Sequence, residues 1–197
     1  MLDVEGFILV GGASRRMGTD KAAMVIGGRT SLERVAAALS AAVSPVTLVG
    51  ARHEYDGVRL RNVPDVHGQW GALGGIHAAL SAAEKDWALI VACDLPFVTP
   101  ELFDRLQSFV DNDTDAIVPI QSDGRPQPLC ALYRRATCLP ELEKLIAAGE
   151  HTPRAVLANV RTRRIEFDEL NDLPGADDFF FNLNTSADFA RAKKLLA

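Results

Sequence analysis

The first residues in the chain whose types and spacing could do chemistry are three cations in a glycine-containing loop. Arg15, Arg16 and Lys21 lie in GGASRRMGTDK, directly after the apolar run at 7–10. Glycine lacks the Cβ atom that would keep a phosphate away from backbone N–H groups, and three cations suit a triphosphate better than a single carboxylate. The loop lacks both the GxGxxG spacing of dinucleotide-binding folds and the GK[ST] ending of a P-loop. The alternative is a solvated surface turn.

A single carboxylate follows the most apolar segment of the chain. Asp94 comes two residues after WALIVA at 87–92, a run of six residues without charge. A carboxylate in a poorly solvated crevice needs a compensating cation, and proteins hold Mg²⁺ with one or two carboxylates together with substrate phosphates. Asp94 is therefore the best candidate for a metal ligand in the sequence. The alternative is a carboxylate that caps the turn after the strand.

Another carboxylate lies ahead of a cluster of glycines. Asp65 follows an expected strand and precedes Gly71, Gly74 and Gly75. A carboxylate accepts two parallel hydrogen bonds, which suits the N1–H and amine of guanine or a ribose diol. The glycines would let a flat base or sugar lie against the backbone. A turn-forming aspartate, and glycines that only allow close packing at a helix start, are the alternatives.

The elements that must position these residues alternate between short apolar strands and alanine-rich helices. Strands are predicted at 7–10, 45–50, 58–63, 87–92, 115–120, 128–134 and 162–167, and helices at 31–43, 71–85, 100–110, 136–148, 153–159 and from Ser186. This alternation predicts an α/β fold, a three-layer α/β/α sandwich around a mostly parallel, Rossmann-like sheet. Ligands of such sheets gather outside the carboxyl ends of the strands, where the glycine loop, Asp65 and Asp94 fall.

Composition and charge disfavour several classes of protein. The chain has 197 residues and a net charge of -5, which argues against general binding to nucleic acid backbones. Three cysteines without metal-type spacing indicate reduced thiols, and four histidines form no zinc pattern. No apolar run approaches the roughly 20 residues that a bilayer requires, and the N-terminus lacks the basic region of a signal peptide. We therefore expect a cytoplasmic protein without membrane or nucleic acid partners.

Five segments together are similar to the molybdenum cofactor guanylyltransferases, which belong to the nucleotidyltransferase superfamily. They are LVGGASRRMGTDK, GALGGIHAAL, ACDLPF, DGRPQPLCALYR and FFFNLNTSADF, in the order that the family shows. The first segment alone supports only the wider superfamily, which includes sugar-nucleotide and cytidylyl enzymes. The resemblance implies a nucleotide-diphospho-sugar transferase-like fold and a Mg²⁺-dependent reaction. In that reaction GMP passes from GTP to molybdopterin carrying molybdenum, and pyrophosphate is released.

The resemblance also implies roles for individual residues. The residues implied to bind substrate are Leu9, Val10, Gly11, Gly12, Lys21, Asp65, Gly74, Asp94, Asn182 and Asn184. Asp94 would hold Mg²⁺, while Lys21 and Arg16 would offset charge on the transferring and leaving phosphates. Taken alone, the NxN pattern of the two asparagines before a helix is often only a cap.

Two departures from the family pattern concern nucleotide recognition rather than the reaction. Ala51 precedes Arg52 where the family often has an asparagine followed by arginine. The family's GPLAG is GALGG in this chain, with Ala72 in place of the proline and glycine at 74. Any base contact from the missing asparagine side chain is therefore absent or supplied by another residue.

We expect one nucleotidyltransferase domain over 1–197, with a nucleotide-binding part at about 1–110 and an acceptor-binding part at about 111–197. The expected partners are GTP, molybdopterin, and proteins that deliver molybdopterin or mature molybdoenzymes. Two alternatives stay open. One is a transferase that uses CTP on the same cofactor, or another nucleotide on another phosphate acceptor. The other is a noncatalytic module that binds a nucleotide or the pterin.

Overall fold

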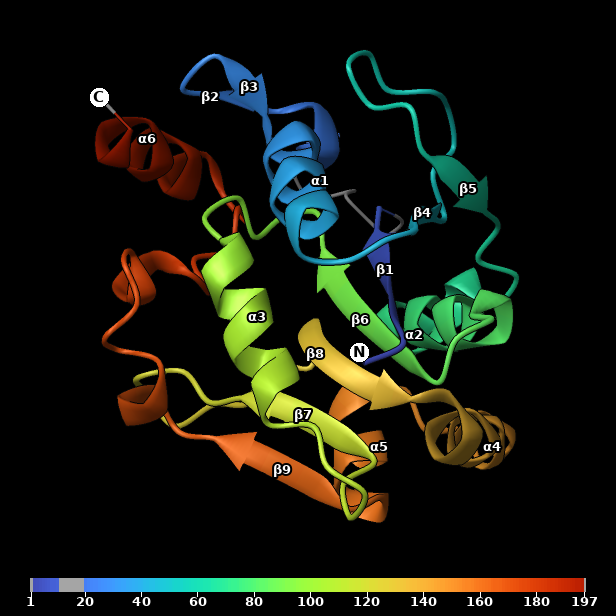
Figure 1. The fold of residues 1–197 in the computed structure, drawn as a ribbon. Helices are drawn as coiled ribbons and strands as arrows, with labels where there is room; N and C mark the ends of the chain where they lie inside the picture. Colours follow the sequence, from blue (N-terminus) through green and yellow to red (C-terminus); the bar gives the residue numbers. More distant parts are fainter. Residues whose placement is uncertain (1, 11–19, 197) are drawn as a thin grey trace.

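The computed structural model describes residues 2–10 and 20–196 and is built around one seven-stranded sheet (Figure 1). Its strand order is β5-β4-β1-β6-β8-β7-β9. The strands are β1 (Val4–Leu9), β4 (Val46–Val49), β5 (Arg61–Val63), β6 (Trp87–Ala92), β7 (Ala116–Pro119), β8 (Cys130–Arg134) and β9 (Thr162–Ile165). Only β8 runs antiparallel to its neighbours β6 and β7, and the other pairs are parallel. The predicted mostly parallel sheet is confirmed.

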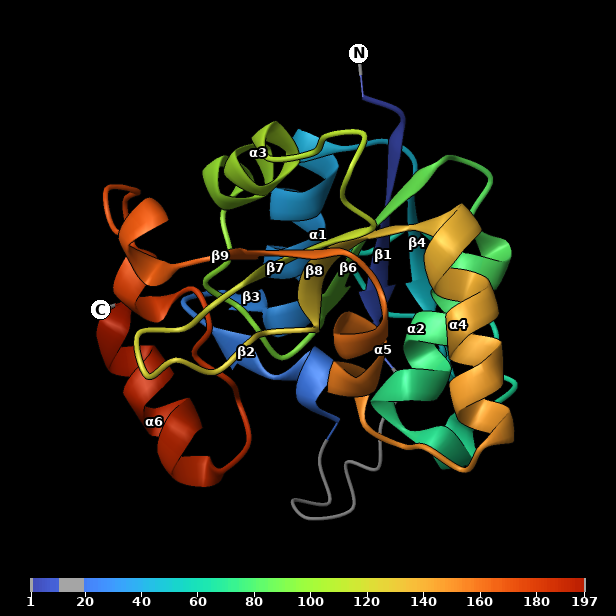
Figure 2. The same cartoon turned by 90° about the horizontal axis from the view of Figure 1, so that it is seen from below.

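The helices cover both faces of this sheet. They are α1 (Ser31–Ala42), α2 (Ala72–Ala82), α3 (Pro100–Ser108), α4 (Arg135–Ala147), α5 (Pro153–Asn159) and α6 (Ser186–Leu195). Figure 2 shows the sheet nearly edge-on, with α1 and α3 on one side and α2, α4 and α5 on the other. The three-layer α/β/α sandwich is therefore confirmed. None of the described helices is both long and apolar enough to span a membrane.

Alternating side chains on the strands supply two separate apolar layers. In β1, Ile8 packs into the layer that contains α1 and α3, whereas Phe7 and Leu9 pack into the layer that contains α2, α4 and α5. In β6, Leu89 and Ile90 divide in the same way. Because successive side chains of a strand point to opposite faces, an uncharged strand needs cover on both sides. The prediction made from WALIVA is confirmed.

Helix starts follow the capping signals in the sequence. The N–H of Glu33 donates to Thr30 Oγ1 at 3.1 Å, and Glu33 Oε2 accepts from the N–H of Thr30 at 2.6 Å. This reciprocal pair satisfies two backbone groups at the start of α1. Thr99 caps α3 ahead of a proline in the first turn. Both helices begin where the sequence predicts.

Two local features differ from the predicted elements. Strand β1 begins at Val4 rather than at residue 7, because the buried carboxylate of Glu5 accepts hydrogen bonds from the N–H groups of Glu84 and Lys85. A small hairpin of β2 (Val25–Ile26) and β3 (Arg29–Thr30) was not predicted. Its turn is Gly27–Gly28, and both glycines have positive φ, as a two-residue hairpin turn requires.

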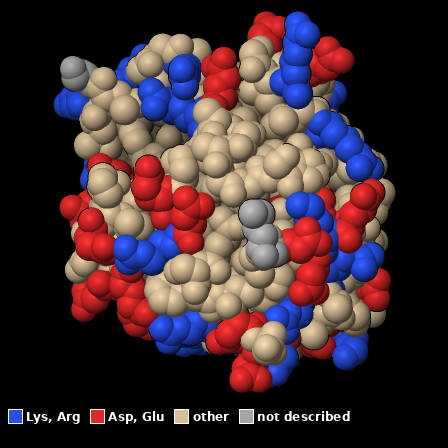
Figure 3. All heavy atoms as spheres, viewed as in Figure 1, with Lys and Arg blue, Asp and Glu red and all other residues tan. Residues whose placement is uncertain are grey.

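The surface in Figure 3 carries both signs of charge. Lysines and arginines are interspersed with aspartates and glutamates over the face that Figure 1 draws. General binding to nucleic acid needs a clustered basic patch instead. The mixed surface of this face agrees with the low net charge of -5.

Candidate functional site

Two parallel strands end side by side at the centre of the sheet. Leu9, the last residue of β1, is opposite Ala92, the last residue of β6. The N–H of Cys93 donates to the carbonyl oxygen of Leu9 at 3.1 Å, and the N–H of Val10 donates to that of Val49 at 2.9 Å. The chain segments after β1 and β6 therefore leave the sheet at one edge. The predicted residues Gly11, Gly12 and Arg16 lie outside the described residues.

Lys21, Asp94 and Asn184 come together at this edge from three distant parts of the chain. Lys21 begins the short helical turn η2 (Lys21–Ala23). Its Nζ atom donates to Asn184 Oδ1 at 2.6 Å and lies 3.4 Å from Asp94 Oδ2. The side chains of Lys21 and Asp94 are 22% and 21% exposed, so a ligand can reach both while water solvates neither fully. The structure therefore brings together the lysine and the aspartate that the sequence singles out.

The carboxyl group of Asp94 is poorly compensated. Burial raises the pKa of Asp94 above the usual 3.8, and the nearby ammonium of Lys21 only partly opposes that effect. A raised pKa on a carboxylate that ligands can still reach is common among groups that bind or react. A further cation would stabilise the ionised form, so the donor is suited to Mg²⁺ that arrives with phosphates. Within the described part of the chain, no three histidine, cysteine, aspartate or glutamate side chains cluster as a metal site.

The C-terminal segment is fixed against the end of β6. The N–H of Leu183 donates to the backbone carbonyl oxygen of Asp94 at 3.0 Å. Asp188 Oδ2 accepts from the N–H groups of Asn184 and Thr185 at 3.0 and 2.8 Å, and Thr185 is the N-cap of α6. The Asn184 side chain therefore contacts Lys21 rather than capping the helix. The amide of Asn182 donates to the carbonyl oxygen of Phe180 at 3.0 Å.

Asp65 lies at the same edge of the sheet but two strands away from β1, after β5. Its Oδ1 atom accepts from the N–H of His67 at 3.0 Å, so Asp65 forms the turn that the alternative interpretation predicts. A Cβ atom at Gly74 would clash with the carbonyl oxygen of His67 and lie 3.1 Å from Asp65 Oδ1. Gly74 thus allows this turn to pack against the start of α2. One carboxylate oxygen of Asp65 is held by the turn, which orients the group.

The Ala51 backbone is held by a side chain that the sequence analysis did not single out. The N–H of Ala51 donates to Asn62 Oδ1 at 3.2 Å, and Asn62 Nδ2 donates to the carbonyl oxygen of Ala51 at 3.0 Å. Residues 51–60 leave the sheet here as a loop. Together with Leu48 and Asn62 they line a groove of about 890 Å³.

A second set of polar residues, also missed from the sequence, supports the turn that carries Lys21. Asp20 is the N-cap of η2, and its Oδ2 atom accepts a hydrogen bond from the Tyr55 hydroxyl at 2.6 Å. His53 Nε2 lies 3.5 Å from the same oxygen. Burial and the contact with Asp20 raise the pKa of Tyr55 well above its usual value, so the hydroxyl stays protonated and donates. The only sequence signal was an aspartate directly before the lysine.

Comparisons with known proteins identify the family to which these features belong. Residues 6–165 match the family model of the MobA-like NTP transferase domain. The chain belongs to this family. Within it, a probable molybdenum cofactor guanylyltransferase of Pelotomaculum thermopropionicum is 36% identical to the chain, over 98% of this chain and 93% of the relative. A molybdenum cofactor guanylyltransferase of Desulfosudis oleivorans is 32% identical, over 96% of this chain and 94% of the relative.

A solved structure supports the same assignment for this MobA-like chain. Molybdopterin-guanine dinucleotide biosynthesis protein A from Archaeoglobus fulgidus superposes with a TM-score of 0.81 at 28% identity, covering 97% of both chains. The resemblance found in the five sequence segments is confirmed, as is the nucleotide-diphospho-sugar transferase-like fold. The protein is therefore an enzyme of the nucleotidyltransferase class.

Proposed function

We propose that this protein transfers GMP from GTP to molybdopterin carrying molybdenum, with Mg²⁺ as the cofactor, and releases pyrophosphate. The observation that carries the proposal is the meeting of Lys21, Asp94 and Asn184 at the carboxyl edge of the sheet. Relatives that align with nearly the whole chain are named molybdenum cofactor guanylyltransferases, which supports guanine and the pterin acceptor.

Asp94 and Lys21 would bind different parts of the Mg²⁺-triphosphate. Asp94 would hold Mg²⁺ through its carboxylate, together with phosphate oxygens of the nucleotide. When bound, Mg²⁺ would neutralise negative charge on the reacting phosphate and on the leaving pyrophosphate. An ammonium group has three N–H donors, and Asn184 and Asp94 account for two of them in Lys21. Among the residues that the structure describes, the third N–H has no partner, so it would donate to a phosphate oxygen, and Arg16 would offset charge on the leaving phosphates.

The reaction needs no strong general base from the chain. The attacking group is the terminal phosphate of molybdopterin, which is largely ionised at neutral pH because the second pKa of a phosphate monoester is about 6. The chain therefore aligns two anionic reactants and stabilises charge that develops in the transition state. A site built from an ammonium, a buried carboxylate and an amide has the chemistry for this task.

The remaining predicted residues would bind the nucleoside and the acceptor. The backbone of Leu9, Val10, Gly11 and Gly12 would lie against the nucleotide, as would Gly74. Asp65, whose carboxyl group the 65–67 turn orients, would accept hydrogen bonds from the nucleoside. We assign the nucleotide to a part of the domain at about 1–110 and the acceptor to about 111–197. Asn182 and Asn184 come from that second part.

The test is a comparison of the four nucleoside triphosphates. The protein is incubated with each one, with Mg²⁺ and with molybdopterin carrying molybdenum, and pyrophosphate and the dinucleotide product are measured. We expect release of pyrophosphate with GTP and little release with the other three. Preference for CTP would replace the proposal with a cytidylyltransferase. Tight binding of GTP without pyrophosphate release would replace it with a noncatalytic module.

A further inference from the structure

We propose that Tyr55 is a positioning residue for the reaction, which acts through Asp20 to hold Lys21 in place. The inference rests on the proposed function in one respect, because it concerns the lysine assigned to the triphosphate. It adds a residue from the loop at 51–60, which neither the sequence motifs nor the comparisons connect with the site.

Both oxygens of the Asp20 carboxylate are held. Oδ1 accepts from the N–H of Ala22 at 3.0 Å, which caps η2, and Oδ2 accepts from the Tyr55 hydroxyl at 2.6 Å. A carboxylate fixed at both oxygens fixes the backbone to which it belongs. Lys21 is the next residue in the chain, so the hydrogen bond from Tyr55 sets where the Lys21 side chain starts.

The Lys21 side chain depends on that starting point. Its stem is a flexible chain of four carbons, and ordering such a side chain is entropically unfavourable. A turn of three residues has little stability of its own, because so short a helical segment forms few hydrogen bonds for the dihedral angles it fixes. The contacts from Lys21 Nζ to Asp94 and Asn184 therefore require that η2 be held from outside. The buried side chain of Ala22 and the N–H of Ser31, which donates to the carbonyl oxygen of Met24 at 2.9 Å, hold the end of η2, and the Asp20–Tyr55 hydrogen bond holds its start.

Tyr55 is itself fixed to the body of the fold. The N–H of Val58 donates to the carbonyl oxygen of Tyr55 at 3.2 Å, which closes a turn in the loop. Gly57 has a φ of +81°, and a Cβ atom there would clash with the carboxylate of Glu33. Glu33 belongs to the capping box of α1, so the loop at Gly57 lies against the first turn of that helix. Tyr55 and Asp20 thus connect the start of η2, and with it Lys21, to the first turn of α1.

The chain offers a matched control, because it has two tyrosines. Tyr133, in β8, also uses its hydroxyl, which donates to the carbonyl oxygen of Pro128 at 2.7 Å. We expect Tyr55→Phe to raise the KM for GTP about 10-fold, since a misplaced binding group weakens productive binding of substrate. Tyr133→Phe should lower Tm and leave KM within about twofold, because the buried hydrogen bond that is lost joins Tyr133 to Pro128 and involves neither Asp20 nor Lys21.

A double-mutant cycle shows whether Tyr55 acts through Lys21. In the Lys21→Ala background, Tyr55→Phe should cause no further loss, because the group that it positions is gone. An equal loss with and without Lys21 would overturn the proposal, as would a Tyr55→Phe variant with wild-type KM.

Binding of Mg²⁺-pyrophosphate, measured by calorimetry, separates this inference from the proposed function. Any nucleotidyl transfer releases pyrophosphate, so its binding should depend on Lys21 whichever base the enzyme prefers. A protein that transfers no GMP but binds pyrophosphate about 10-fold more weakly after Tyr55→Phe keeps the positioning role and loses the proposed function. Normal GMP transfer and unchanged pyrophosphate binding in Tyr55→Phe would overturn the positioning role alone.

Discussion

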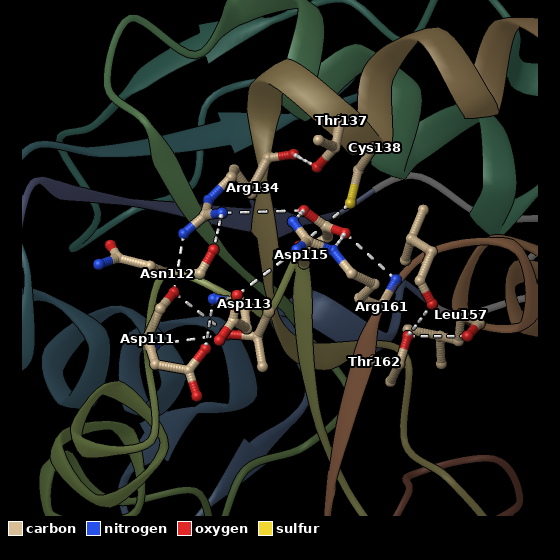
Figure 4. A network of polar contacts seen from close by, with 12 residues as sticks. Asp111, Asn112, Asp113, Asp115, Arg134, Thr137, Cys138, Leu157, Arg161 and Thr162 are labelled. Carbon is tan, nitrogen blue, oxygen red and sulfur yellow. Dashed lines mark hydrogen bonds and ion pairs between the residues drawn. The ribbon is translucent and has the colours of Figure 1, made fainter.

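Two aspartates at opposite edges of the sheet show how differently one side chain can be used. Asp94 follows β6 at the carboxyl edge, and Asp115 precedes β7 at the amino edge. Asp115 is 4% exposed and is held by Arg161, whose Nε and Nη2 atoms donate to its two oxygens at 2.8 and 3.0 Å (Figure 4). Asp94 has Lys21 at 3.4 Å instead. Within residues 2–10 and 20–196, Asp115 is therefore paired at both carboxylate oxygens, and Asp94 has a longer contact with Lys21 at one oxygen.

The pKa values of the two carboxyl groups are shifted in opposite directions, as their different partners require. Hydrogen bonds from Arg161 hold the pKa of Asp115 below the usual 3.8, whereas burial raises the pKa of Asp94 above it. Arg134 adds a more distant ion pair to Asp115, at 3.8 Å. Removing one partner of a buried ion pair destabilises a fold because it leaves the other charge unpaired, while an incompletely paired carboxylate can accept a further cation. This contrast supports our proposal that Asp94 binds a cation, and we assign Asp115 a structural role.

The largest effect is expected from Asp94→Asn. The variant keeps the size of the side chain but loses the charge that would bind Mg²⁺, so kcat should fall by about 10³-fold or more. The unfolding free energy should stay equal or rise, because a poorly compensated charge is removed. Pyrophosphate release and thermal unfolding measure the two quantities. Near-normal turnover with Mg²⁺ would exclude Asp94 as the metal ligand.

Lys21→Ala should have the next largest effect. The loss of the ammonium removes a phosphate contact, so kcat/KM for GTP should fall by about 10²-fold through both KM and kcat. Lys144→Ala is the matched control, since Lys144 is 74% exposed on α4 and pairs only with Glu141 in the described chain. Steady-state kinetics of both variants test the assignment. Equal kinetics in the two variants would favour a solvated surface lysine at position 21.

Asp115→Asn makes the same substitution at the structural aspartate. It should lower the unfolding free energy by about 2 kcal/mol, because Arg161 loses its charged partner at a buried position. The values of kcat and KM should stay within about twofold of the wild type, since the residue is at the edge away from the site. Urea denaturation and kinetics check the two parts. A stable variant with impaired turnover would reverse the contrast with Asp94.

The pH dependence of stability should separate the two aspartates more finely. Because the folded-state pKa of Asp94 is raised, the contribution of this group to the unfolding free energy is fully present below pH 3.8. That contribution is lost as the pH rises through the higher, folded-state pKa. Because the pKa of Asp115 is lowered, its contribution is present above pH 3.8 and is lost as the pH falls through that lower value. Asp94→Asn should thus change the slope of the unfolding free energy against pH above pH 3.8, and Asp115→Asn should change that slope below pH 3.8. Unfolding free energies measured across the acid range test both directions, and coincident changes would contradict them.

Local patterns predicted most of the fold. The uncharged run at 87–92 became β6, and the Thr30–Glu33 spacing marked the start of α1. Such features depend on neighbours in sequence, so a single chain reveals them. The predicted start of β1 at residue 7 was wrong because the charged Glu5 lies within the strand. Its partners are backbone N–H groups about 80 residues away, which the local sequence does not reveal.

The site was predicted in part. The position of Asp94 after a buried strand, and of Lys21 after a glycine loop, was enough to select them. Asn184 came from the resemblance alone, since its contact with Lys21 spans 163 residues of sequence. Tyr55 was missed because its hydrogen bond to Asp20 joins two loops that no local pattern connects. Contacts that depend on how the chain folds back were beyond the sequence analysis.

A structure of the protein with GTP and Mg²⁺ is the most direct test of the site. We expect the metal about 2.1 Å from an Asp94 carboxylate oxygen, with Lys21 Nζ within hydrogen-bonding distance of a phosphate oxygen. A triphosphate bound away from β1 and β6, or a metal that Asp94 does not contact, would contradict it.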